Sequence, residues 1–238
     1  MHLADRIANA FLVRESDGLY LVDTLFRESA GRIQAALAQV GPEKPLRAIL
    51  LTHQHMDHVG GAARLHWLTG APVSAHPFDT PAIERTGPGV GPALLTWLLR
   101  RPAVTVSNVV REGATVGPFE VIHVPGHTPG SVAYYHKAKG LLFTGDALMR
   151  GNHGTLSLPR RSYSYDPEAA AASLAKFARL NVRGIFPGHG APILEDASTQ
   201  LQAAIERQGK IEVPVDHTLF GPEGRPEMHP GMPGWKEG

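Results

Sequence analysis

The chain contains no cysteine. Disulfide bonds, thiolate metal ligands and a cysteine nucleophile are therefore excluded. The absence of disulfides is compatible with a cytoplasmic protein, and we expect that location. The opening stretch MHLADRIANAFLVRESDG carries charges throughout, so it does not resemble a secretory signal.

Long apolar runs and an excess of charge of one sign are also missing. No stretch approaches the ~18 consecutive apolar residues of a transmembrane helix, so we expect no membrane span. Lysine and arginine number 23 against 22 aspartate and glutamate residues, which gives a formal charge of +1. Because a balanced chain has no global field to attract nucleic acid, we expect none as a partner.

What is present suffices for one sizeable domain. The 238 residues are 42% hydrophobic and 19% charged, which provides enough apolar material for a core. The last 28 residues contain five prolines and five glycines, a density typical of an extended tail. We therefore expect one domain over residues 1–210 and a tail over 211–238.

Strands and helices are mixed along the chain. Hydrophobic patterns and turn residues predict strands over 8–14, 18–23, 46–52, 71–76, 119–124, 131–136, 140–144 and 183–187. They predict helices over 27–40, 57–69, 166–180 and 196–208, the third starting at Asp166-Pro167-Glu168 with an N-cap aspartate. Two mixed sheets with helices outside are consistent with this order.

The segment THQHMDH, residues 52–58, is the most informative in the chain. Side chains two apart in an extended segment point the same way, so His53 and His55 can share one cation. Asp57 and His58 follow at the start of a predicted helix and can turn toward a second cation, with Gly60-Gly61 allowing close packing behind them. Imidazole and carboxylate ligands suit zinc, and also iron or manganese.

Three later segments repeat one arrangement of strand, sharp turn and potential ligand. They are VIHVPGHTPGS with His127, LLFTGD with Asp146 and GIFPGHG with His189. Most histidines after strands are ordinary hydrogen-bonded residues, and we assign that role to His2, His66, His123, His136, His217 and His229. His76 and His153 are candidates for supporting the ligands. Five of the 13 histidines nevertheless fall in strand-end turns with two matching aspartates, which predicts a metal site.

The motifs THQHMDH, PGHTPGS, FTGD and PGHG resemble the ordered motifs of the metallo-β-lactamase superfamily across about residues 8–195. The resemblance implies an α/β (α+β) fold, a four-layer αββα sandwich with metals at one edge. It implies a first metal on His53, His55 and His127, a second on Asp57, His58 and His189, and Asp146 bridging both. Val22-Asp23-Thr24 is similar to the family's early aspartate turn, although leucine follows where glycine is usual.

The expected activity is that of a binuclear metallo-hydrolase with glyoxalase II-like metal motifs. Two divalent ions, zinc in the first place and iron or manganese as alternatives, can hold a bridging hydroxide that attacks a carbonyl group. Asp57 would orient the hydroxide or pass a proton to the leaving group, and Asp146 would hold both ions. We expect a small ester-like substrate, namely a thioester, a lactone or a carboxylic ester.

Three alternatives remain open at this point. A phosphodiesterase or nuclease of the same fold is the second choice, and an iron-dependent sulfur oxygenase shares part of the ligand set. A non-enzymatic metal-binding module is disfavoured, because the ligand set is complete.

Two segments could shape the pocket. Residues 87–102 combine glycine hinges with the apolar run ALLTWLL, so they could form a lid, a homodimer interface or part of the core. Residues 160–165, RRSYSY, could bind an anionic group, but an ordinary solvated loop is favoured there.

Overall fold

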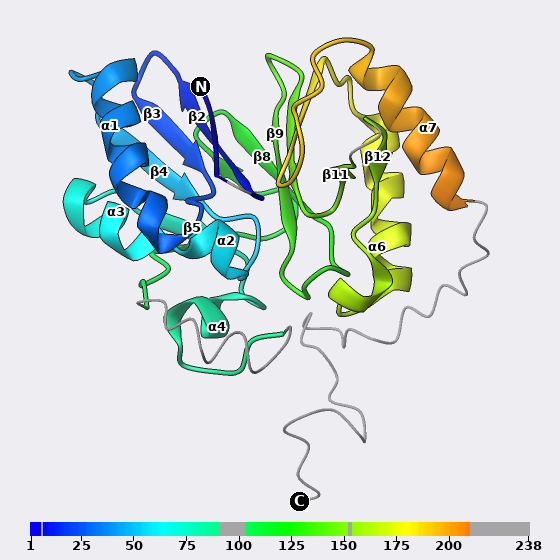
Figure 1. Ribbon diagram of the computed structural model, residues 1–238, viewed down its shortest axis with the longest axis horizontal. Coiled ribbons are helices and arrows are strands. Elements are labelled where there is room, and N and C mark those ends of the chain that lie inside the picture. The colour runs from blue at the N-terminus through cyan, green and yellow to red at the C-terminus, as the bar shows by residue number, and fades with distance from the viewer. Residues whose placement is uncertain (6, 91–102, 152–153, 210–238) are drawn as a thin grey trace, which may run out of the picture.

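Two β-sheets face each other and carry helices on their outer faces (Figure 1). The computed structural model describes residues 1–5, 7–90, 103–151 and 154–209. Both sheets mix parallel and antiparallel neighbours. The predicted αββα sandwich of two mixed sheets is therefore confirmed. Within the described part of the chain, no helix is long and apolar enough to cross a membrane.

The first sheet has six strands in sequence order: β1 (His2–Ala4), β2 (Asn9–Arg14), β3 (Leu19–Val22), β4 (Leu46–Leu50), β5 (Val73–Ala75) and β6 (Asn108–Val109). The second has five strands in the order β13 (Gly184–Pro187), β10 (Leu141–Gly145), β9 (Val132–His136), β8 (Phe119–His123) and β7 (Thr115–Val116). A separate hairpin pairs β11 (Met149–Arg150) with β12 (Leu156–Ser157).

Helices α1 (Ala30–Val40) and α3 (Ala62–Thr69) cover the first sheet, and α6 (Pro167–Ser173) and α7 (Ala197–Gly209) cover the second (Figure 1). The shorter helices are α2 (Met56–Val59) and α4 (Thr80–Glu84), with 3-10 turns at η1 (Arg27–Ser29), η2 (Arg161–Tyr163) and η3 (Leu174–Arg179).

The two-residue period of the strands builds the layers. On β3, Leu21 joins the apolar cluster beneath α1 and α3, whereas Tyr20 points into the cluster between the two sheets. On β9, Tyr134 enters the same central cluster and Tyr135 faces the helices of the second sheet. Because successive strand side chains point to opposite faces, each buried strand supplies two hydrophobic layers at once. This explains why the strands are apolar on both faces.

The helix predicted over 57–69 is broken into α2 and α3 at Gly60-Gly61. A Cβ at Gly60 would lie 2.6 Å from the backbone nitrogen of Arg27, and one at Gly61 would lie 2.5 Å from the carbonyl oxygen of Thr24. The expected close packing at these glycines is therefore confirmed. The single-helix prediction was wrong because the backbone nitrogen of Gly61 donates to the carbonyl oxygen of Leu25 in the preceding loop, at 3.3 Å, which interrupts the helical hydrogen-bond pattern.

The helix start at Asp166 is confirmed. Its carboxylate accepts a hydrogen bond from the backbone nitrogen of Ala169 at 2.8 Å, and Pro167 is the first helical residue. The α-helix ends earlier than predicted, at Ser173, and continues as the 3-10 turn η3. Hydrophobic periodicity did not reveal β1, β6, β7, β11, β12 or α4, because elements of two to five residues are too short to show a period.

Candidate metal centre

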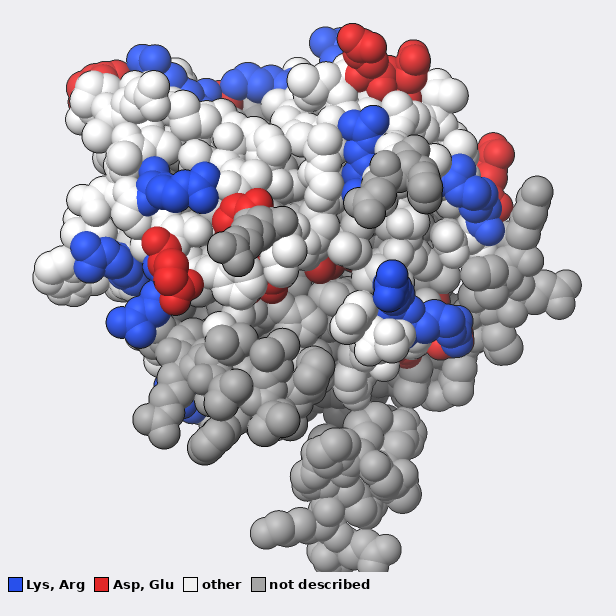
Figure 2. Space-filling model, in the orientation of Figure 1, with Lys and Arg blue, Asp and Glu red and all other residues white. Residues whose placement is uncertain are grey.

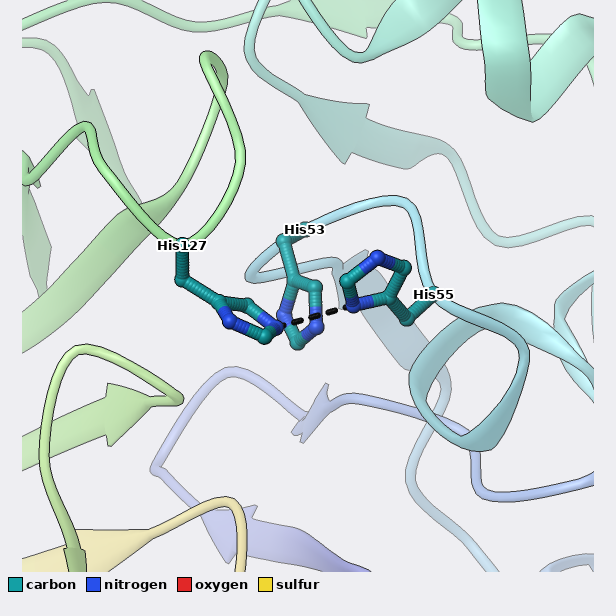
Figure 3. Close-up of side chains that lie close together, drawn as sticks. All are labelled: His53, His55 and His127. Carbon is teal, nitrogen blue, oxygen red and sulfur yellow. Dashed lines mark hydrogen bonds between the residues drawn. The ribbon is translucent and has the colours of Figure 1, made fainter. Parts of the chain in front are cut away.

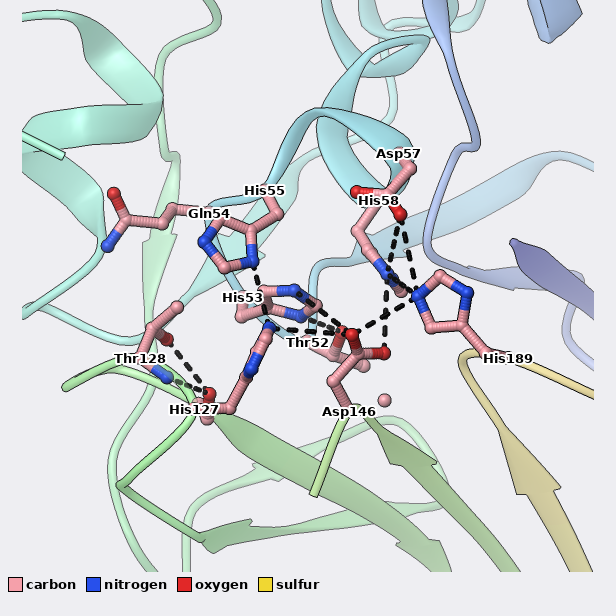
Figure 4. Close-up of polar contacts among 12 residues, drawn as sticks. Thr52, His53, Gln54, His55, Asp57, His58, His127, Thr128, Asp146 and His189 are labelled. Atoms are coloured by element: carbon pink, nitrogen blue, oxygen red, sulfur yellow. Dashed lines mark hydrogen bonds and ion pairs between the residues drawn. The ribbon is translucent and has the colours of Figure 1, made fainter. Parts of the chain in front are cut away.

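Segments that follow strands of both sheets surround one cluster of polar side chains (Figure 4). His53 and His55 follow β4, and His127 lies in the turn between β8 and β9. Asp146 directly follows β10, and His189 comes two residues after β13. Parallel pairing of β10 with β13 brings these last two ends together. The chain thereby gathers ligand-type side chains that are far apart in the sequence.

The first histidine group consists of His53, His55 and His127, whose rings point toward one another (Figure 3). One ring nitrogen from each lies within 4.8 Å of the others. Nδ1 of His55 is 2.8 Å from Nε2 of His127. Three imidazoles at this spacing can hold one cation.

The second group consists of Asp57, His58 and His189, with ligand atoms again within 4.8 Å of one another. Oδ2 of Asp57 lies 3.7 Å from Nε2 of His58 and 3.4 Å from Nε2 of His189. Asp57 and His58 come from α2, so a helix start presents them to a histidine from the other sheet.

Asp146 lies between the two groups (Figure 4). Its Oδ2 is 3.4 Å from Nε2 of His127 and 3.1 Å from Nε2 of His189. Its Oδ1 is 3.4 Å from Nε2 of His58. One carboxylate therefore faces ligand atoms of both groups.

Hydrogen bonds on the outer side of two rings aim their inner nitrogens at the cluster. Thr52 Oγ1 donates to Asp23 and so accepts from Nδ1 of His53, at 3.0 Å. Nδ1 of His58 donates to Oδ2 of Asp23 at 2.8 Å. Both rings then have Nε2 available as a lone-pair donor, the usual arrangement behind metal-binding histidines.

Two more rings are oriented by backbone carbonyls. Nε2 of His55 lies 3.3 Å from the carbonyl oxygen of Val90, so Nδ1 is the nitrogen that faces His127 and the cluster. Nδ1 of His189 donates to the carbonyl oxygen of Ile7 at 2.5 Å, so Nε2 is the nitrogen that faces Asp57 and Asp146. Four of the five histidines thus receive a defined tautomer from a neighbour.

Buried polar atoms without partners indicate that a cation fits here. Among the described residues, Nε2 of His53, Nδ1 of His127 and Oδ1 of Asp146 are buried and make no hydrogen bond. Leaving such groups unpaired is costly, and buried polar groups are normally satisfied. A metal ion between the groups would satisfy the first and third of these atoms, so the donor set fits divalent metal.

The two groups differ in charge. Burial lowers the pKa of His53 well below its ordinary value and that of His127 to about 4. Burial acts in the same direction on His58, but Asp146, Asp57 and Asp23 outweigh it and raise its pKa to about 10. The pKa of His55 is lowered as well, so the histidines of the first group are neutral in the metal-free protein, whereas His58 carries a proton that a metal must displace.

Asp23 is placed directly behind the site. Its backbone has φ 57°, a left-handed conformation that is uncommon outside glycine. This conformation turns the carboxylate onto Thr52 and His58. Asp23, in the Val22-Asp23-Thr24 turn that is similar to the family's aspartate turn, therefore contacts a ligand-type histidine directly, although leucine follows the turn.

Asp79 is a functional candidate that the sequence analysis missed. The sequence Asp79-Thr80-Pro81 has the form of a helix start, and α4 indeed begins at Thr80. The carboxylate does not cap that helix. It is fully buried and bonds to the loops that carry the first histidine group. In the sequence, Asp79 has only the pattern of a helix cap, and this pattern gives no indication of its contacts with the histidine-bearing loops.

The other histidines have ordinary roles where the structure describes them. His2 bonds to Asn9, His66 to the carbonyl of Ala71, His123 to the carbonyl of Pro129, and His136 to Glu15. His76, a candidate for supporting the ligands, stacks on His123 with ring centroids 3.9 Å apart. His153, His217 and His229 lie outside the described residues.

The structure describes only part of the two segments, 87–102 and 160–165, that could shape a pocket. The second of them is described in full. Of residues 87–102, positions 91–102 lie outside the described residues, but Val90 contacts His55. In the 160–165 loop, the backbone nitrogen of Tyr165 donates to the carbonyl of His127 at 3.1 Å. Arg161 pairs with Glu168, so its charge already has a partner within the protein.

Comparisons with known proteins agree with this arrangement. The sequence profile of the metallo-beta-lactamase superfamily matches residues 3–189. Probable metallo-hydrolase YybB of Bacillus subtilis (strain 168) is 32% identical over 191 residues, which cover 78% of this chain and 82% of that protein. Hydroxyacylglutathione hydrolase of Pseudomonas aeruginosa (strain LESB58) is 40% identical over 140 residues, which cover 58% of this chain but only 45% of that protein.

Solved structures share the fold. A di-iron-bound form of TTHA1623 has a TM-score of 0.66 at 32% identity and covers 84% of this chain and 96% of its own. The B3 metallo-beta-lactamase BLEG-1 has a TM-score of 0.67 at 28% identity and covers 78% of this chain and 88% of its own. Together with the paired His/Asp groups, these matches show that the chain is a metallo-hydrolase and belongs to the metallo-beta-lactamase superfamily.

Proposed function

We propose that the protein binds two divalent metal ions and hydrolyses a small ester-like substrate: a thioester, a lactone or a carboxylic ester. The position of Asp146 carries the proposal, because its carboxylate faces His127 of one group and His189 of the other. A carboxylate so placed can neutralise and bridge two cations. A single-metal protein would not need this second, complete group.

The ligand assignment follows the two groups. His53, His55 and His127 would hold the first ion, and Asp57, His58 and His189 the second, with Asp146 shared between them. All of the ligands are nitrogen or oxygen donors, which favours zinc and also admits iron or manganese. The di-iron form of TTHA1623 supports keeping iron among the candidates.

When bound, two such ions lower the pKa of water and polarise the oxygen of a substrate carbonyl. The residues around the ions would orient the substrate and neutralise the positive charge of the ions. Asp57 is the more exposed of the two ligand aspartates, with a side chain 18% exposed against 6% for Asp146. Asp57 can therefore face water and the leaving group, accept a proton and pass it on. Asp146 is shielded and keeps its negative charge, because neighbouring histidines hold its pKa well below the usual range despite burial.

Support for a carbonyl ester comes from the relatives and from the surface. One relative is a hydroxyacylglutathione hydrolase, of which the match covers 45%, and its name gives an acylated glutathione as the substrate. On the face shown in Figure 2, lysine and arginine side chains are scattered between acidic and uncharged ones, and the described residues gather no continuous basic patch there. Nucleic-acid binding depends on neutralising phosphates, so this surface favours a small substrate.

The test combines metal analysis with a substrate panel. Protein purified without chelator should contain two metals per chain and should cleave at least one of an S-acyl glutathione, an aliphatic lactone and a p-nitrophenyl ester. Bis(p-nitrophenyl) phosphate, RNA and a cephalosporin complete the panel, the last because BLEG-1 is a B3 metallo-beta-lactamase.

Turnover confined to the phosphodiester or the cephalosporin would overturn the proposed substrate class. One tightly bound iron with no second ion would favour a sulfur oxygenase instead. Activity lost with a chelator and restored by zinc, iron or manganese would identify the metal that supports turnover.

A further inference from the structure

Asp79 connects the two loops that carry the first histidine group. It lies beyond β5, and its side chain is fully buried. Oδ2 accepts from the backbone nitrogen of Gln54 at 2.9 Å and from the hydroxyl of Thr128 at 2.7 Å. Oδ1 accepts from Nε2 of Gln54 at 3.0 Å and from the backbone nitrogen of Gly130 at 2.9 Å. Four donors therefore converge on one carboxylate.

These donors are adjacent to the ligands. Gln54 stands between His53 and His55 in the chain, and Thr128 directly follows His127. The two loops follow strands of different sheets, β4 in one and β8 in the other. Other hydrogen bonds also join the two sheets near this edge, such as the one from the backbone nitrogen of Val132 to the carbonyl oxygen of Thr52 at 2.9 Å. The contacts of Asp79 add a direct link between the two histidine-bearing loops.

Only an ionised carboxylate matches this set of four donors. It offers about four acceptor positions on two oxygens and no donor. Hydrogen bonds to an ionised acceptor are also stronger than those between neutral groups. Gly130 is required by the same contact, since a Cβ there would lie 2.6 Å from Cγ of Asp79.

The contact extends to the back of His55. Oε1 of Gln54 accepts from the backbone nitrogen of Val90 at 3.1 Å. The carbonyl oxygen of Val90 in turn lies 3.3 Å from Nε2 of His55. Asp79 thus holds Gln54, Gln54 holds Val90, and Val90 orients the imidazole.

We propose that Asp79 is a positioning residue for the first metal: it keeps His53, His55 and His127 at the spacing that binds one ion. It acts through Gln54 and Thr128 and touches neither metal nor substrate. Asp23 has the corresponding place behind the second group, through His58. The inference rests on the proposed two-metal centre, and it gives the first group a buried carboxylate in addition to Asp23, which reaches His53 through Thr52.

The variant Asp79→Asn tests this with little change in volume. An amide keeps one acceptor oxygen but turns an NH2 group toward two N–H or O–H donors. We expect the first metal to bind about 10–100-fold more weakly, the usual effect of removing a residue that orients metal ligands. The second metal should keep its affinity, so dialysis against a graded chelator should leave Asp79→Asn with one ion where the wild type keeps two.

Two further proteins identify which ion is lost. His189→Ala removes a ligand of the second group and should retain the first ion. The double variant Asp79→Asn/His189→Ala should retain neither. Cobalt substitution gives an independent readout, because the absorption bands of the cobalt that remains in Asp79→Asn should match the second site alone.

Several results would overturn the inference. Asp79→Asn with two ions at wild-type affinity would do so, as would equal weakening of both ions, which indicates a general structural role. If the double variant Asp79→Asn/His189→Ala still held one ion, the ion lost from Asp79→Asn would not be the one held by the first histidine group. A wild-type protein without metal would instead overturn the proposed centre itself, which separates the two failures.

A milder pair of variants covers the case in which Asp79→Asn does not fold. Thr128→Val removes only the hydroxyl that donates to Asp79, and we expect it to weaken the first ion alone. Thr80→Val is the matched control, since its hydroxyl bonds to the carbonyl of His76 and not to either loop. Wild-type affinity for both ions in Thr128→Val would contradict the positioning role.

Discussion

Oδ2 of Asp23 lies 2.8 Å from Nδ1 of His58 and accepts a second hydrogen bond, also of 2.8 Å, from the hydroxyl of Thr52. The same hydroxyl of Thr52 also bonds to Nδ1 of His53, at 3.0 Å. One buried carboxylate therefore orients a histidine in each half of the candidate metal centre. This relationship yields the first prediction.

Asp23→Asn should weaken metal binding, most strongly at the second group. The amide removes the charge that supports His58 and presents a donor where two donors already point. A loss of about 10–100-fold in metal affinity or turnover is expected. Competition with a chromogenic chelator measures the affinity. Asp17→Asn is the control, because Asp17 bonds to the Tyr20 hydroxyl rather than to the metal groups. Equal affinities in both variants would contradict the assignment.

Asp146→Ala should lose at least one ion and nearly all turnover. Without the shared carboxylate, two cations repel each other with no anion between them. Metal content and activity are measured on the same preparation. Asp166→Ala is the matched control, since it removes a helix cap and should cost about 1 kcal/mol of unfolding free energy while both ions stay bound. Near-normal activity of metal-replete Asp146→Ala would refute the bridging role.

Metal uptake should release a proton from His58. Burial alone would lower its pKa, but Asp146, Asp57 and Asp23 raise it to about 10, so the metal-free ring is charged at neutral pH. A metal needs the neutral ring, so proton and metal compete and affinity should fall as pH falls below about 10. Calorimetry at pH 8 in buffers of different ionisation enthalpy counts the protons. Binding without proton release at that pH would contradict the prediction.

Gly188→Ala should impair the site more than the fold. A Cβ at Gly188 would collide with Oδ1 of Asp146 and lie 2.7 Å from Cε1 of His58. We expect at least a tenfold loss of turnover. Gly31→Ala is the control, because nothing lies within 4 Å of its Cβ position in α1. It should stabilise the protein by roughly 0.5–1 kcal/mol. Thermal unfolding and activity of the two variants separate an effect on stability from an effect on the site. A fully active Gly188→Ala would show that Asp146 and His58 can move to accommodate the methyl group.

Much of the candidate centre could be predicted from the sequence. The first four ligand-type residues come directly after the apolar run 46–52, and the other three, His127, Asp146 and His189, each follow an apolar run and sit beside a glycine. This pattern is local in the sequence. The strands that form the centres of the two sheets were predictable for a related reason, since apolar residues on both faces indicate a strand buried between two layers. The two- and three-residue strands β1, β6, β7, β11 and β12 were not. The break at Gly60-Gly61 was not predictable either, because it depends on contact with Leu25 in the preceding loop.

The partners of the ligands depended on the fold. Asp79 reaches Thr128 across 49 positions of the chain, and Asn9 bonds to the carbonyl of Pro187 across 178. Strand order and the packing of one sheet on the other decide which histidines lie close enough to hold one ion and which carboxylate lies behind them. Residue types and their order determine what chemistry the chain can support. Only the tertiary structure decides which side chains share a site, because hydrogen bonds and metal coordination act over about 3 Å whatever the separation in sequence.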